Sequence, residues 1–146
     1  MMSIETVNQI IDRLAAAGLP ADAAPLTVER FSALLGAPLQ PASADPYWKT
    51  YTFALAGGPF RGGELRLNAA GDGALLILEP RDPPGLGLSD VNRQALGQRQ
   101  GMLPNPNIPP EGIDAEYYQP GRPRLALQWT HRSHRLRSLV LEWSAP

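Results

Sequence analysis

The stretch ELRLNAAGDGALLIL (residues 64–78) is the strongest structural signal in the chain. Leucine alternates with polar residues over 64–68, a Gly-Asp-Gly turn follows, and residues 74–78 are continuously apolar. Alternation with a period of two predicts a half-buried strand, and the glycine-rich turn predicts a hairpin. A continuous apolar strand is typical of the middle of a sheet. The stretch therefore predicts a β-hairpin whose second strand is central in the sheet.

Two helices and one strand are predicted before this hairpin. Apolar residues recur at helical spacing in a first segment, for which Ser3 is the expected N-cap and Gly18 the expected C-terminal stop. They recur again over residues 27–35, where Thr27 is the expected N-cap. Aromatic and β-branched residues then alternate over residues 47–55, a pattern that favours a strand.

A short helix and three strands are predicted after the hairpin. The helix covers residues 89–96, and the strands cover residues 116–119, 124–130 and 136–143. The last two strands carry matched apolar faces, so we expect them to pair. Runs of strands after helices are typical of an antiparallel α+β domain. We therefore expect one globular α+β domain over residues 1–146, with an antiparallel sheet of about five to six strands, two N-terminal helices and one short helix between the two strand groups.

Proline and glycine are concentrated in the connections between these elements. The chain has 16 prolines and 14 glycines, which gather at residues 36–46, 57–63, 80–87 and 104–123. Proline restricts a loop and glycine lets it turn, so these segments are expected to be stiff surface loops.

Composition excludes several classes of protein. Thirteen basic and fourteen acidic residues leave a net charge of −1, which excludes a generally basic nucleic-acid binder. The absence of cysteine excludes a disulfide framework and a thiolate metal site. No signal peptide and no membrane-spanning run is visible, so a cytoplasmic location without membrane association is expected. Twelve of the thirteen basic residues are arginine, a bias expected of a GC-rich bacterial genome.

No motif indicates catalysis, a cofactor or a metal. The glycine stretches at 57–63 and 85–90 lack the ending of a phosphate-binding loop, and no serine stands in a nucleophile elbow. The only histidines, His131 and His134, are flanked by three arginines whose charge opposes a bound cation. We therefore expect no catalytic, cofactor-binding or metal-binding residue.

The C-terminal segment is more basic than the rest of the chain. From Gln119 onward it holds five arginines and one glutamate, near Tyr117, Tyr118 and Trp129. Arginines beside aromatic rings can hold phosphates and stack on bases. No nucleic-acid-binding signature accompanies them, so a nucleic-acid partner is not expected.

An acidic surface is the predicted binding feature. The candidate carboxylates lie in or beside the proline-rich connections, which are expected at the surface because their backbone groups lack internal partners. Such a surface can attract a basic protein by electrostatic steering. The candidate partner-binding residues are Asp82, Asp90, Glu111, Asp114 and Glu116.

These observations favour a non-enzymatic protein-binding domain, in particular a cytoplasmic immunity protein that neutralises a cognate bacterial toxin by occlusion. The first alternative is a small-ligand-binding domain or enzyme with a cleft between the sheet and the proline-rich loop, near His131 or His134 and close to Tyr117 or Tyr118. The second is a homo-oligomer that pairs through an edge strand or an exposed apolar face of the terminal hairpin.

Overall fold

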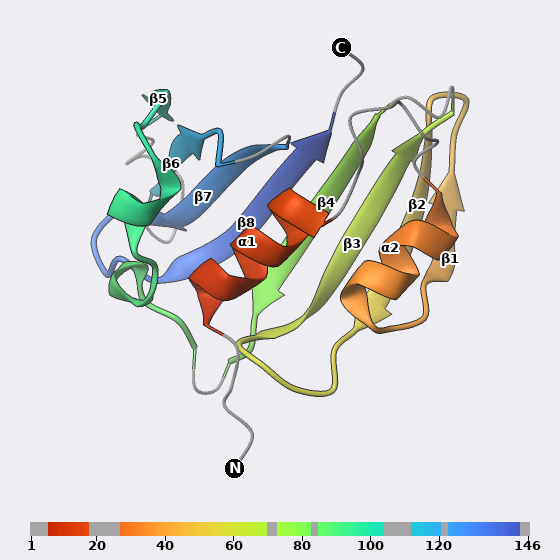
Figure 1. Cartoon of the computed structure of the whole chain (residues 1–146), viewed down its shortest axis with the longest axis horizontal. Coiled ribbons are helices and arrows are strands. Elements are labelled where there is room, and N and C mark those ends of the chain that lie inside the picture. Colours follow the sequence, from red (N-terminus) through yellow and green to blue (C-terminus); the bar gives the residue numbers. More distant parts are fainter. Residues whose placement is uncertain are drawn as a thin grey trace.

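The fold is built on an antiparallel β-sheet. The computed structural model describes residues 6–17, 27–69, 73–82, 85–103, 112–120 and 123–143, and these contain eight strands. The bounds are β1 Gln40–Ala44, β2 Trp48–Ala54, β3 Phe60–Asn68, β4 Ala74–Pro80, β5 Gly101–Leu103, β6 Ile113–Tyr118, β7 Arg124–Thr130 and β8 Leu136–Trp143. They lie in the order β1-β2-β3-β4-β8-β7-β6-β5 (Figure 1).

Two four-stranded meanders meet in the middle of this sheet. Strands β1 to β4 pair in chain order, as do β5 to β8, and the last strand of each meander pairs with the other. At this junction Leu76 lies opposite Leu141, and Ile77 lies opposite Val140. The predicted central position of residues 74–78 is therefore confirmed, because β4 has a partner on each side.

Both helices, α1 (Val7–Ala17) and α2 (Val28–Leu35), cover the same face of the sheet (Figure 1). The Thr27 side chain caps α2 by accepting from the Arg30 backbone N–H at 3.2 Å, as predicted. Gly36 ends this helix in the left-handed conformation, with φ of 66°.

Phe31 of α2 is fully buried and packs edge-on against the Trp143 ring of β8, with centroids 5.2 Å apart. The helices therefore close the core over the central strands.

The strands bury one face and leave the other partly exposed. Buried leucines alternate with more exposed residues along β3, β4, β7 and β8, and the buried ones pack beneath the helices. We call the opposite side the open face, since neither helix lies on it. Its central strand residues are Glu64, Arg66, Leu75, Ile77, Glu79, Tyr117, Arg124, Ala126, Gln128, Ser138, Val140 and Glu142.

The expected strand count of five to six is wrong, because the sheet has eight. Strand β1 lies in a segment with proline and alanine that shows no strand pattern, and all five of its residues are exposed. Strand β5 has only three residues. Both lie at the edges of the sheet, where pairing on one side is enough to form a strand without burying side chains.

The expected short helix over residues 89–96 is also wrong. Two 3₁₀ turns, η1 (Leu88–Asp90) and η2 (Arg93–Leu96), occupy this segment. Between them, Asn92 exchanges two hydrogen bonds with the Asn8 side chain of α1, at 2.7 and 2.9 Å. These bonds use the backbone groups that a continuous helix would have used itself, so the contact with α1 interrupts the helix.

Candidate functional site

The acidic candidates do not form one surface. Asp82 and Asp90 are exposed, as predicted. Asp82 lies 3.7 Å from Arg135, and the Asp90 carboxylate accepts from the Gly87 backbone N–H at 2.7 Å. Glu111 lies outside the described residues. Of the four candidates that the structure describes, two are therefore exposed carboxylates.

The predicted surface position of Asp114 and Glu116 is wrong. Their exposed fractions are 4% and 3%. Strand β6 begins at Ile113, three residues before the expected start, so both residues belong to the sheet. Asp114 lies opposite Trp129 and Glu116 opposite Leu127, and both of those partners are core residues. The alternation of the strand therefore turns the two carboxylates toward the covered face.

The buried carboxylate of Glu116 is the centre of a polar cluster, which we call the Glu116 cluster. Its Oε1 lies 3.1 Å from Arg93 Nη1 and 3.3 Å from Arg99 Nη1, and the Tyr118 hydroxyl donates to its Oε2. Burial, followed by the hydrogen bond to Glu116, raises the pKa of Tyr118 to about 12. Arg93 also lies over the Trp129 ring, 5.9 Å from its centroid. The cluster therefore ties η2 and the segment before β5 to strand β6.

The histidines are placed differently from each other. Nδ1 of His131 lies 2.9 Å from Oδ2 of the buried Asp114, and the His131 side chain is 40% exposed. His134 is exposed in the β7–β8 turn with φ of 52°.

Within the described residues, no group of three potential ligands among His, Cys, Asp and Glu could hold a metal. In the same part of the chain, no helix has the length and apolar character to cross a membrane.

A hollow lies on the open face where β4, β6, β7 and β8 approach the loop that contains Asp82 and Leu86. Its volume is about 520 Å³. Neither histidine lines it, so this is not the cleft expected near His131 and His134. We call it the β4–β8 hollow, and its lining residues are Arg61, Ile77, Glu79, Pro80, Asp82, Gly85, Leu86, Ile113, Gln128, Thr130, Arg135, Leu136, Arg137 and Ser138.

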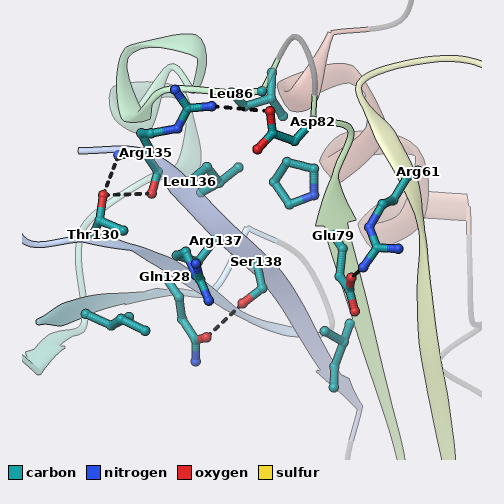
Figure 2. Close-up of a pocket in the computed structure, with 14 residues that line it drawn as sticks. Arg61, Glu79, Asp82, Leu86, Gln128, Thr130, Arg135, Leu136, Arg137 and Ser138 are labelled. Atoms are coloured by element: carbon teal, nitrogen blue, oxygen red, sulfur yellow. Dashed lines mark hydrogen bonds and ion pairs between the residues drawn. The ribbon is translucent and has the colours of Figure 1, made fainter. Parts of the chain in front are cut away.

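The charged groups of this hollow are unequally paired (Figure 2). Arg61 forms an ion pair with Glu79 on one side. Arg135 lies 3.7 Å from Asp82 at the rim, at the long end of ion-pair distances. Arg137 has no hydrogen bond or ion pair within the described part of the chain. It is therefore the cation of the hollow that is available to a ligand.

A β-bulge places Arg137 at this site. Gln128 pairs with Ser138 and Trp129 with Leu136, so Arg137 is an extra residue on β8. In the sequence, Arg137 is only one of five C-terminal arginines and is not singled out as a functional candidate. The sequence carries one signal of the bulge. The buried Leu136 and Leu139 are three residues apart, whereas residues on the same face of a regular strand are separated by an even number of positions.

Comparisons of the chain with protein-family models, curated proteins and solved structures found no match. No relative therefore assigns a role to the hollow or to the Glu116 cluster.

Proposed function

We propose that the chain is a non-enzymatic protein-binding domain that docks its partner on the open face. In its narrower form, the proposal is a cytoplasmic immunity protein that occludes a cognate bacterial toxin. The observation that carries it is a sheet face on which neither helix lies, with apolar residues on its two central strands.

The centre of the open face has the character of a protein interface. Leu75 and Ile77 of β4 and Val140 of β8 are partly exposed on neighbouring strands. Toward β6, the Arg124 guanidinium lies over the Tyr117 ring, 4.3 Å from its centroid. Apolar patches rimmed by polar residues mark interaction sites, and tyrosine and arginine are enriched among residues that dominate binding energy.

The acidic candidates have a smaller part in this proposal. Asp82 lines the β4–β8 hollow on the open face, so it is retained as a rim contact. Asp90 is exposed and stays a candidate. Asp114 and Glu116 are buried, so the proposal assigns them no direct contact with the partner. The expected acidic patch is thus replaced by an apolar centre with charges around it.

The test is protection of cells from the toxic product of a gene that neighbours the one encoding this chain, combined with calorimetric titration of the two purified proteins. Ile77→Asp places a charge at the centre of the open face, and we expect it to weaken binding at least about tenfold and abolish protection. Ala33→Asp is the matched control, because Ala33 is exposed on α2, which covers the other face. It should protect like the native chain.

Two outcomes would overturn the proposal in different ways. A toxin that is neither bound nor neutralised by the native chain contradicts the immunity function. Full binding by Ile77→Asp, with circular dichroism showing a folded chain, contradicts the open face as the docking surface.

A further inference from the structure

We propose that the β4–β8 hollow binds a small organic monocarboxylate, with Arg137 receiving the carboxylate group. The hollow shares Ile77 and Asp82 with the proposed docking surface, but its ligand is a small molecule and its test needs no toxin. Its ligand is defined by three properties of the hollow: its charge, its hydrogen-bond donors and its apolar wall.

The charge of the hollow favours an anion with one negative charge. Three arginines and two carboxylates line it, which leaves one positive charge in excess. Arg61 is neutralised by Glu79, and Arg135 lies next to Asp82. A monocarboxylate on Arg137 would complete this pattern, whereas a phosphate dianion would leave the hollow negative.

The donors lie side by side on β7 and β8. Figure 2 shows Arg137 beside Gln128 and Ser138. Ser138 Oγ donates to Gln128 Oε1 at 2.7 Å. The amide Nε2 of Gln128 forms no hydrogen bond with the described residues, so it can donate to a ligand. A planar guanidinium matches the two oxygens of a carboxylate, and an amide N–H can donate to one of them as well.

The remaining wall favours an apolar body on the ligand. Ile77, Pro80, Leu86 and Ile113 line the hollow from β4, β6 and the loop after β4. The volume of about 520 Å³ falls within the range of small-molecule sites, about 300–1,000 Å³. The bulge that carries Arg137 belongs to a paired strand, so the receiving group is held by the sheet rather than by a loop.

The experiment titrates the isolated chain with hexanoate and follows backbone amides by two-dimensional NMR. We expect saturable shifts at Gln128, Arg137 and Ser138. Hexanamide has the same body without the charge, and inorganic phosphate is an anion without the body; both should bind at least about tenfold more weakly than hexanoate.

Two variants with the same change of charge locate the site. Arg137→Gln should weaken hexanoate binding at least about tenfold. Arg66→Gln is the matched control, because Arg66 is on the open face, pairs with Glu64 at 3.0 Å and does not line the hollow. It should bind like the native chain.

Each contrary result has a definite meaning. The proposal is overturned if hexanoate gives no saturable shift, or if Arg137→Gln binds it as tightly as the native chain. Equal binding of hexanamide, or tighter binding of phosphate, overturns the carboxylate as the recognised group. No toxin is present in these titrations, so a failure here leaves the docking proposal untouched.

Discussion

Arg93 of η2 and Glu116 of β6 form an ion pair in which only the carboxylate is buried. Arg93 Nη1 lies 3.1 Å from Glu116 Oε1, and the side chains are 43% and 4% exposed. Breaking the ion pair therefore has a larger free-energy cost at Glu116 than at Arg93. Water can hydrate the partly exposed arginine, but it cannot reach the buried carboxylate. Arg99 provides the second cation, 3.3 Å from the same oxygen.

We expect the two arginines to substitute for each other in stabilising Glu116. Arg93→Gln or Arg99→Gln alone leaves one cation on the carboxylate and should lower the free energy of unfolding by about 1 kcal/mol. The double variant leaves a buried charge without a cation and should lower it by about 3 kcal/mol or more. Urea unfolding of the four chains gives these values and their coupling.

Arg132→Gln is the control for the loss of positive charge, because Arg132 is exposed and forms no hydrogen bond or ion pair with the described residues. It should change stability by less than about 0.5 kcal/mol. Strict additivity of the two single losses would show that the arginines act independently, contrary to this prediction.

Stability at alkaline pH should depend on Tyr118. Burial and the bond to Glu116 raise its pKa from 10.0 to about 12. Between pH 10.0 and about 12 the folded chain keeps the phenol proton of Tyr118 and the unfolded chain loses it, so rising pH favours unfolding. The contribution of Tyr118 is complete below pH 10.0 and is lost as the pH rises through about 12.

The comparison is with Tyr118→Phe, which lacks the titrating group. Urea unfolding at pH values below, within and above this pH range should show the native chain losing stability relative to the variant, by up to about 1.4 kcal/mol per pH unit. Parallel pH profiles would show that Tyr118 titrates alike in the folded and unfolded chains.

The parts of the fold that were predictable are those where the side-chain pattern and the burial agree. The Thr27 cap, the alternation over 64–68 and the matched faces of β7 and β8 all appear in the structure. Each depends on residues close in sequence, or on apolar residues that share one face. Such signals remain visible without knowing the partner strand.

The missed parts depend on distant contacts. Strand β1 exists because β2 pairs with it, and its exposed residues need no apolar pattern. Glu116 is charged, which is typical of a surface residue, and its burial depends on Arg93 and Arg99 from another segment. The β4–β8 hollow collects residues from β3, β4, β6, β7 and β8, so no continuous motif could have indicated it.

Gly63 should be essential for the close pairing of β3 and β4. A Cβ added there would overlap the carbonyl oxygen of Ile77, which is backbone and cannot rotate away. We expect Gly63→Ala to lower the free energy of unfolding by about 2 kcal/mol or more. Gly57→Ala is the control, since a Cβ at that position meets nothing within 4 Å. Equal thermal stability of the two variants would contradict the close approach of the strands.

Leu75 and Leu76 provide a direct test of which face is covered. They are adjacent on β4, but Leu76 is fully buried beneath the helices and Leu75 is only partly buried on the open face. Leu76→Ala should leave a cavity and cost about 2–5 kcal/mol. Leu75→Ala should cost about 1 kcal/mol, because the side chain gives up less buried area. Comparable losses in urea unfolding would mean that the open face is packed in the isolated chain, and a partner could then not dock there without first displacing what covers it.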